Sequence, residues 1–404
     1  MSTSTLSEGV FAINKPKSVS SAQTLRDLQK AFNSSKFFAS WLSAEKVNRS
    51  IKSFGERRRR KKPVEVKLGH GGTLDPMATG VLIVGVGKGT KSLQNYLSCT
   101  KTYEATILFG AATDSYDTLG KILNKAPYAH ITRERVEEAL EKFRGKIMQR
   151  PPLYSALHVQ GKRLYEYARE GKEVPVEIQE RPVEVQELRI VEWLEGGSHQ
   201  YKWPSQEAET EDKEPAEVVL HLQDIPGTST ETCKKQSENE DHSRKRRRTV
   251  DEEEDVVAAS VPTRKSQQVE KTFCMSGGLQ EPDPEGTENA KSEDPVSISQ
   301  GLSSSEEQPP AVRLRMTVTS GFYVRSLAHD LGKAVDSLGC MSDLIRTTQE
   351  NFQLGRNVLE WSDIKGGEEV WASKLETMLQ DWQDRIEEPG DHEKPEPIPQ
   401  SAIV

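Results

Sequence analysis

The stretch that decides the fold runs from His70 to Lys91 and reads His-Gly-Gly-Thr-Leu-Asp-Pro-Met-Ala-Thr-Gly-Val-Leu-Ile-Val-Gly-Val-Gly-Lys-Gly-Thr-Lys. It places one carboxylate, Asp75, in a loop of glycines and small polar residues, directly before an apolar run. Pro76 restricts the backbone next to this carboxylate, and the glycines allow tight turns. A carboxylate held rigidly by the backbone suits nucleophilic or proton-transfer chemistry. The structural alternative is that Asp75 caps a helix that begins near Met77.

Four further blocks accompany this stretch along the chain. They are Gly9-Val-Phe-Ala-Ile-Asn-Lys15-Pro16, Lys101-Thr-Tyr103-Glu104, the segment from Arg150-Pro-Pro-Leu-Tyr154 to Gly171, and Ser320-Gly-Phe-Tyr323-Val-Arg325-Ser-Leu-Ala-His-Asp-Leu-Gly332. With the Asp75 stretch they resemble, in the same order, the motifs of the TruB-type tRNA pseudouridine synthases. The resemblance covers most of residues 8–195 and 311–355. The layout is most similar to eukaryotic, fungal-type members, which make pseudouridine-55 in tRNA.

The resemblance implies an α+β fold, the pseudouridine-synthase catalytic domain, with a mixed, mostly antiparallel sheet flanked by helices and a long disordered insertion. It also implies a reaction: uridine-55 of the tRNA T-loop is flipped out and isomerised to pseudouridine at an essential aspartate. An isomerisation needs no cofactor, metal or nucleotide, and we expect none. The segment 85–91 superficially resembles a phosphate-binding loop, but its glycine spacing does not fit that motif.

Three residues are the expected catalytic set by this resemblance. Asp75 is the essential carboxylate, and two roles stay open for it: addition to the sugar, or removal of a proton from C2′. Arg325 is expected to keep Asp75 ionised, because a guanidinium stays charged and can bind a carboxylate through two hydrogen bonds. Tyr103 is expected to stack on the base and to remove the proton from C5. Alone, Arg325 would be an ordinary ion pair at a helix start, and Tyr103 a strand tyrosine.

Five more residues are expected at the substrate site. Tyr323 is a wall of the pocket, Lys15 supports the active-site structure, and His70 helps to position the flipped nucleotide. Arg150 and Tyr154 belong to a segment, residues 144–172, in which arginines, lysines and tyrosines alternate. This segment is expected to contact the T-loop, although the same pattern fits an ordinary strand-and-helix surface.

The composition restricts the class of protein. Apolar residues make up 34% of the 404, which is low for a chain that folds throughout. The four cysteines are scattered without a CxxC pair, which argues against a zinc site and a disulfide framework. No apolar run approaches the length that spans a membrane, and the N-terminus lacks a signal-peptide core.

The acidic residues are concentrated in three segments, 207–214, 224–310 and 384–404. Together these segments carry 14 Lys and Arg against 30 Asp and Glu, so the overall charge of −8 leaves +8 on the rest of the chain. A basic remainder fits a surface that binds RNA phosphates.

The hydrophobic patterns predict several elements. Residues 10–15 read as a short strand, and Ser20 or Ser21 as the cap of the helix that follows. Residues 103–109 read as a strand, and Thr132 caps an amphipathic helix. Residues 312–319 alternate between apolar and polar, which predicts a half-buried strand that leads into Tyr323 and Arg325.

These patterns predict four parts of the chain. Residues 8–223 form the first part of the catalytic domain, with a basic insertion at 34–66 that contains the cationic run Arg57–Lys62. Residues 224–310 form a disordered insertion, 311–383 the second part of the domain with one or two C-terminal helices, and 384–404 a disordered tail. The basic run Arg244–Arg248 predicts nuclear import, and a mitochondrial pool stays open.

Two alternative functions remain open at this point. The chain could be a guide-RNA-dependent snoRNP-type pseudouridine synthase, or a non-catalytic RNA chaperone that has kept the fold. The expected partner is tRNA, with mRNA left open as a further substrate. A monomer without an obligate protein partner is expected.

Overall fold

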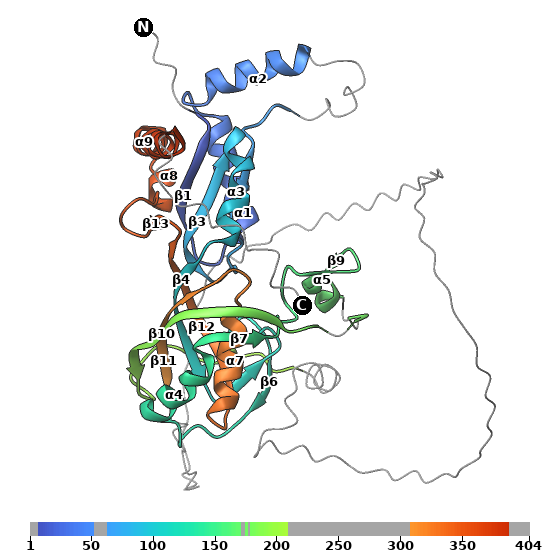
Figure 1. Ribbon diagram of the computed structural model, residues 1–404, viewed down its shortest axis with the longest axis vertical. Coiled ribbons are helices and arrows are strands. Elements are labelled where there is room, and N and C mark those ends of the chain that lie inside the picture. Colours follow the sequence, from blue (N-terminus) through green and yellow to red (C-terminus); the bar gives the residue numbers. More distant parts are fainter. Residues whose placement is uncertain (1–6, 52–62, 171–173, 177, 209–307, 388–404) are drawn as a thin grey trace, which may run out of the picture. The chain divides into compact units, whose positions relative to one another are not determined.

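The computed structural model describes residues 7–51, 63–170, 174–176, 178–208 and 308–387 (Figure 1). The cationic run Arg57–Lys62, the basic run Arg244–Arg248 and nearly all of the predicted disordered segments lie outside these residues. The predictions made for them therefore stay predictions.

The described chain forms both helices and strands. The helices are α1 (Ser21–Asn33), α2 (Ala39–Ile51), α3 (Leu93–Ser98), α4 (Arg133–Leu140), α5 (Leu164–Arg169), α7 (Val324–Ala334), α8 (Trp361–Lys365) and α9 (Glu368–Glu387), with short 3-10 turns at Gly87–Lys91 and Glu141–Phe143. The strands are β1 (Gly9–Lys15), β2 (Leu68–His70), β3 (Thr79–Val86), β4 (Lys101–Phe109), β5 (Ala111–Thr113), β6 (Ile122–Lys125), β7 (Gly145–Gln149), β8 (His158–Val159), β9 (Lys162–Arg163), β10 (Arg181–Leu194), β11 (Ala311–Val318), β12 (Gly339–Gln349) and β13 (Phe352–Gln353).

A nine-stranded sheet organises the described chain. Its main path is β1-β3-β12-β4-β11-β10-β7, while β2 pairs with β3 and β13 with β12. Of the strand pairs in this sheet, β3 with β12 is parallel and the others are antiparallel. The predicted α+β fold, with a mixed and mostly antiparallel sheet flanked by helices, is confirmed.

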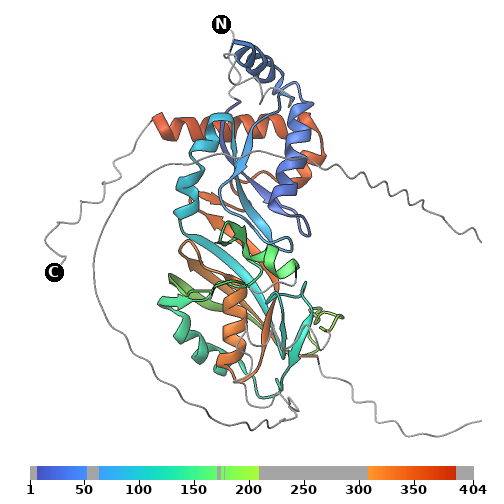
Figure 2. The ribbon, with the colours of Figure 1, turned by 90° about the vertical axis from the view of Figure 1, so that its right-hand side faces the viewer.

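Two hydrophobic clusters cover different halves of this sheet. One joins α4 and α7 to β4, β10, β11 and β12, and the other joins α1, α2 and α9 to β1 and β3. Figure 1 shows α4 and α7 beside β10 and β11, whereas Figure 2 shows the long C-terminal helix close to the N-terminal strands. Both clusters pack on strands of the same sheet, so residues far apart in the sequence share one scaffold.

Several helix caps and strands that the sequence predicted are present in the structure. Ser20 caps α1 by accepting a hydrogen bond from the Gln23 backbone, and Thr132 caps α4 in the same way through Arg135. In β11 the apolar residues are buried and alternate with half-buried polar ones. The helices α8 and α9 occupy the region where one or two were predicted.

The contacts of the described residues extend a few positions beyond two of the predicted boundaries. Gln308 to Pro310 belong to the ordered part, because the Phe109 backbone donates to the Pro310 carbonyl (3.2 Å) and Gln308 donates to the Tyr201 carbonyl (2.7 Å). The second part of the domain therefore begins before residue 311. The helix α9 continues to Glu387, past the predicted end at 383, and Leu375 and Leu379 anchor its middle to the core.

Gly80 tests the parallel pairing of β3 with β12. Its φ is +105°, and a Cβ at this position would lie 2.2 Å from the Arg346 carbonyl oxygen of β12. Gly80→Ala should lower the free energy of unfolding by about 3–5 kcal/mol, combining backbone strain with a steric clash. Gly145→Ala is the control, because Gly145 has φ +76° with open space around it. This variant should lose only about 1–2 kcal/mol in the same denaturant titration. Equal losses would show that the close approach of the two strands is not the constraint.

Candidate active site

Asp75 lies in a β-turn that leads into β3. The Ala78 backbone donates a hydrogen bond to the Asp75 carbonyl (3.1 Å), Pro76 occupies the second turn position, and β3 begins at Thr79. Proline is favoured at this position because its ring fixes the φ angle that such a turn requires. The alternative in which Asp75 caps a helix near Met77 is therefore wrong.

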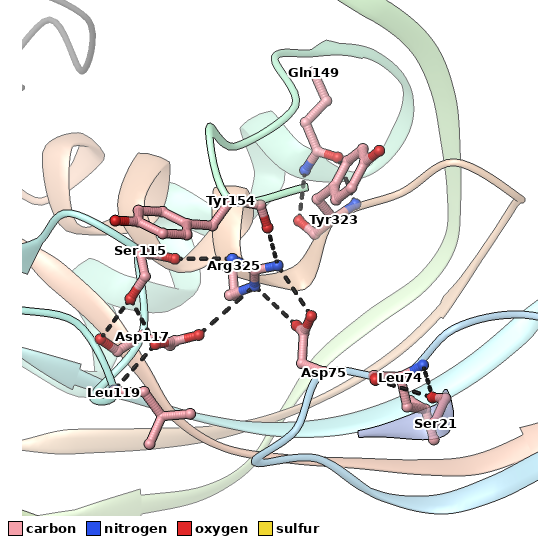
Figure 3. Close-up of polar contacts among 10 residues, drawn as sticks. All are labelled: Ser21, Leu74, Asp75, Ser115, Asp117, Leu119, Gln149, Tyr154, Tyr323 and Arg325. Carbon is pink, nitrogen blue, oxygen red and sulfur yellow. Dashed lines mark hydrogen bonds and ion pairs between the residues drawn. The ribbon is translucent and has the colours of Figure 1, made fainter. Parts of the chain in front are cut away.

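Ser21, the first residue of α1, holds the turn from one side. Its hydroxyl donates to the Leu74 carbonyl (3.1 Å) and accepts from the Leu74 backbone N–H (2.9 Å), as Figure 3 shows. Ser21 is 2% exposed, so these bonds are shielded from water. The residue next to Asp75 is thus fixed through both of its backbone polar groups.

Lys15, at the end of β1, binds the backbone of the Asp75 turn. Its ammonium group donates to the carbonyls of Pro16 (2.8 Å), Val19 (2.6 Å) and Pro76 (3.1 Å). Lys15 is fully buried, and burial lowers its pKa to about 8, although the nearby Asp75 opposes this shift. Because all three donors are used, Lys15 supports the turn, as expected for a residue that supports the active-site structure, and its grouping with the substrate-binding residues stays a prediction.

The glycine loop before Asp75 is held by β12. Gln349 donates to the Gly71 carbonyl (2.7 Å), and the guanidinium of Arg346 donates to the Gly72 carbonyl (3.4 Å). Arg346 is 1% exposed, and Gln349 is fully buried. The loop therefore has little freedom to move.

The guanidinium of Arg325 binds the Asp75 carboxylate through two hydrogen bonds. Nε lies 2.8 Å from Oδ2, and Nη2 lies 3.0 Å from Oδ1 (Figure 3). The expected pairing of these two residues, 250 positions apart in the sequence, is present. The side chain of Arg325 is 8% exposed and that of Asp75 is 28% exposed. The carboxylate is thus held on one side and remains accessible on the other.

Further contacts fix the orientation of this guanidinium. Nη1 donates to the Ser115 carbonyl (3.0 Å), and Nη2 also donates to the Tyr154 carbonyl (2.9 Å). A second carboxylate, Asp117, has Oδ2 3.8 Å from Nε. Asp117 is itself held by the Ser115 hydroxyl (2.6 Å) and by the Leu119 backbone N–H (3.0 Å). One buried cation therefore lies between two carboxylates.

The cation stabilises both carboxylates, whereas the two carboxylates repel each other. Burial alone would lower the pKa of Arg325, but Asp75 and Asp117 raise it above its usual value. Burial raises the pKa of Asp117, which Arg325 opposes and Asp75 reinforces. A buried cation of this kind is retained only with such partners, because desolvation of a lone charge is costly.

Tyr323 is fixed by an amide. Gln149, at the end of β7, accepts from the Tyr323 backbone N–H (2.8 Å) and donates to its carbonyl (3.0 Å). Gln149 is 3% exposed, and Tyr323 is half-buried at the residue before α7 (Figure 3). This pair of bonds fixes the backbone from which Tyr323 projects, two residues before Arg325.

Tyr103 and His70 lie on strands around the turn. Tyr103 is 8% exposed in β4 and belongs to the same hydrophobic cluster as Leu74 and Met77, on either side of Asp75. His70 ends β2, opposite Val84 of β3, and burial lowers its pKa, an effect that Arg346 reinforces. A lowered pKa favours the neutral imidazole. The roles assigned to both residues toward substrate stay predictions.

Arg150 and Tyr154 reach the site through their backbones. The Arg150 carbonyl accepts from the Ser326 hydroxyl (2.8 Å), and the Tyr154 carbonyl accepts from Arg325. Beyond them, β9 and α5 carry cations over tyrosine rings: Lys162 over Tyr167 at 4.8 Å, and Arg163 and Arg169 over Tyr165 at 5.7 and 5.1 Å. The predicted contact of this segment with RNA stays a prediction.

Asp117 and Gln149 were not expected at the site from the sequence. The spacing of Asp117 from Ser115 is a pattern that lets a hydroxyl bind a carboxylate two residues on. Gln149 precedes the Arg150 block directly, but a single glutamine carries no signal without its partner.

Among the residues described, no cluster of His, Cys, Asp and Glu could hold a metal ion, and no helix is long and apolar enough to cross a membrane.

Comparison with known proteins identifies the family. The family model described as TruB family pseudouridylate synthase (N terminal domain) matches residues 58–204. The protein named tRNA pseudouridine synthase 4 of Schizosaccharomyces pombe is 38% identical over 375 residues, which is 91% of this chain and 84% of that protein. The chain belongs to the TruB family.

Another TruB-family relative has similar coverage. The protein named tRNA pseudouridine synthase 4 of Saccharomyces cerevisiae is 34% identical over 383 residues, or 92% of this chain and 84% of that protein. Among solved structures, a Cbf5-Nop10-Gar1 complex aligns with a TM-score of 0.42 and 17% identity, covering 92% of this chain and 57% of that one. The match to the TruB model contains Asp75 and Tyr103, whereas Arg325 comes from a later part of the chain.

Lys15 gives this TruB-family chain a specific pH dependence. Between about pH 8 and the ordinary lysine value of 10.5, Lys15 is deprotonated in the folded state and protonated in the unfolded one. The unfolded state then binds more protons, so the Lys15 contribution to the free energy of unfolding rises with pH in this window and is constant below it. Lys15→Met removes this contribution. The stability of the wild type relative to Lys15→Met should increase from pH 8 to 10.5 in denaturant titrations. A constant difference would contradict the buried ammonium.

Arg325→Met tests the charge arrangement. Removing the cation leaves Asp117, which is 5% exposed, without its charge partner and should lower the free energy of unfolding by about 3–5 kcal/mol. Adding Asp117→Asn to this variant removes the stranded charge, and about 1–3 kcal/mol should return. Denaturant titrations of the single and double variants measure this difference. A double variant less stable than Arg325→Met would show that Asp117 does not depend on the cation.

Proposed function

We propose that this TruB-family protein is a tRNA pseudouridine synthase that converts uridine-55 of the T-loop into pseudouridine. The observation that carries the proposal is the Asp75 carboxylate, held at both oxygens by Arg325 and still 28% exposed at a rigid turn. The names of the two fungal relatives supply the substrate class.

The reaction breaks the N1–C1′ bond, rotates the uracil and joins C5 to C1′, so the atoms of substrate and product are the same. Both roles open for Asp75, addition to the sugar and removal of the C2′ proton, begin with an ionised carboxylate. Arg325 favours that form by placing a fixed positive charge against both oxygens. Because its other donors bind backbone carbonyls, the guanidinium does not need to reorganise during the reaction.

Uridine in a folded tRNA can reach Asp75 only after it leaves its stack. Tyr103 shares a cluster with the residues that flank Asp75, and Tyr323 projects from a fixed backbone at the start of α7. Tyr103 thus provides a ring for the everted base, and Tyr323 a wall of its pocket. His70, favoured as the neutral imidazole, positions the flipped nucleotide without adding charge.

Binding of tRNA rests on the basic remainder of the chain and on β8, β9 and α5. Cations that lie over tyrosine rings can contact phosphates while the rings pack against sugars or bases. We infer that the protein acts as a monomer and without guide RNA. Messenger RNA with a T-loop-like hairpin is a further candidate substrate.

Asp75→Asn tests the catalytic assignment. Conversion of an unmodified tRNA transcript should fall by about a thousandfold or more, which corresponds to about 4 kcal/mol on the barrier. The affinity for tRNA should change less than about twofold, a difference of about 0.4 kcal/mol, because the side chain keeps its shape. Pseudouridine is mapped in the transcript, and binding is measured by titration.

Asp343→Asn is the matched control, because Asp343 is also a partly exposed carboxylate in an ion pair (22% exposed, 2.8 Å from Lys17). It should keep wild-type turnover. Conversion that survives Asp75→Asn would overturn the proposal. If the wild type binds tRNA without converting it, the result would favour an RNA chaperone. If it converts tRNA only when guide RNA is added, the result would favour a snoRNP-type synthase.

A further inference from the structure

Two buried aromatic side chains, Tyr116 and His329, belong to the loop and the helix that hold Arg325. Tyr116 and His329 stack with their ring centroids 4.1 Å apart and their planes 15° from parallel. Tyr116 is 8% exposed and His329 is 2% exposed. A stack this close fixes both the distance and the relative orientation of the two side chains.

Each ring is attached to a part of the site. His329 lies four residues after Arg325 on α7, so both side chains project from the same face of the helix. Tyr116 lies between Ser115, whose carbonyl accepts from Arg325, and Asp117, the second carboxylate. The stack therefore joins the helix that carries the cation to the loop that binds it.

The loop needs such support because of its backbone. Tyr116 has φ +64°, a left-handed conformation that is unfavourable for a tyrosine. Its N–H donates to the Thr113 carbonyl (3.2 Å), and its own carbonyl accepts from Met341 of β12 (2.9 Å). These bonds hold the loop to the sheet. Of the ring contacts described here, the stack on His329 is the one that joins the loop to α7.

We infer that Tyr116 and His329 are positioning residues that fix the guanidinium of Arg325 between Asp75 and Asp117. This inference rests on the proposed function. Without the stack, the Ser115 carbonyl and Asp117 can shift relative to α7, and the guanidinium loses the geometry that presents Asp75 to the substrate. The stack acts through Arg325, so its loss slows the chemical step more than it weakens tRNA binding.

The experiment compares two replacements of His329. His329→Leu fills a similar volume without a ring, whereas His329→Phe keeps a ring that can stack on Tyr116. The single-turnover rate constant for pseudouridine formation should fall about tenfold or more in His329→Leu, because small misplacements of reacting groups have effects of this size. In His329→Phe the rate should stay within about threefold of the wild type, a change of about 0.7 kcal/mol in the barrier. The tRNA affinity of both should stay within about twofold of the wild type.

Leu331→Ala is the control for general damage to α7. Leu331 is fully buried on the same helix and belongs to the sheet-facing cluster, away from the stack. It should lower stability without lowering the single-turnover rate. A normal rate in His329→Leu, or equal losses in His329→Leu and His329→Phe, would overturn the inference. The double variant His329→Leu with Tyr116→Leu should be no slower than the slower of the two single variants. Additive losses in rate would also overturn the inference.

A second measurement does not depend on activity. In protein labelled with ¹⁵N-arginine, the Nε–H of Arg325 is buried against Asp75 and should exchange slowly with solvent. Exchange should be faster in His329→Leu and remain slow in His329→Phe. An inactive wild type that shows this exchange pattern would contradict the proposed function and support the positioning role. Equal exchange rates in all variants would refute the positioning role even if the wild type is active.

Discussion

The site depends on the buried guanidinium of Arg325. The guanidinium of Arg325 makes two hydrogen bonds to Asp75 and two to backbone carbonyls, and it has Asp117 within 3.8 Å. Its desolvation is tolerable only while these partners stay in place. The packing around the site can therefore be understood as a set of contacts that hold Arg325 and Asp75 in their bonding positions.

These contacts come from both halves of the sheet. Ser21, Lys15 and Gln349 fix the turn and loop around Asp75 from α1, β1 and β12. The loop of Ser115 and Asp117 fixes the cation from the other side. β12 takes part in both, because it pairs with β3 in parallel and also binds the Tyr116 carbonyl. It is thus the element that couples the two supports.

The sequence allowed prediction where a pattern was local or a motif was shared. The cap of α1, the alternation of β11 and the pairing of Asp75 with Arg325 were all expected. Asp117 and Gln149 were missed because their roles depend on partners that only the fold brings close, and neither residue stands out from its neighbours. Lys15 was expected to support the site, but a lysine at a strand end gives no sign of its partners, and only the fold shows its three carbonyl acceptors. The C-terminal end of α9 at Glu387 was not predicted, because no residue near it marks the end of a helix.

The order of the chain adds a consequence for its biosynthesis. Asp75 leaves the ribosome 250 residues before Arg325, an interval of about 12–50 s at ordinary elongation rates. Throughout that interval, a nascent chain that has folded β1, β3 and β4 has its aspartate turn but lacks the counter-charge. Insertion of β11 beside β4 carries α7 to the sheet and completes the pair. The ion pair between Asp75 and Arg325 thus forms only after α7 has been synthesised, and a product truncated before α7 would have the aspartate turn without its cation.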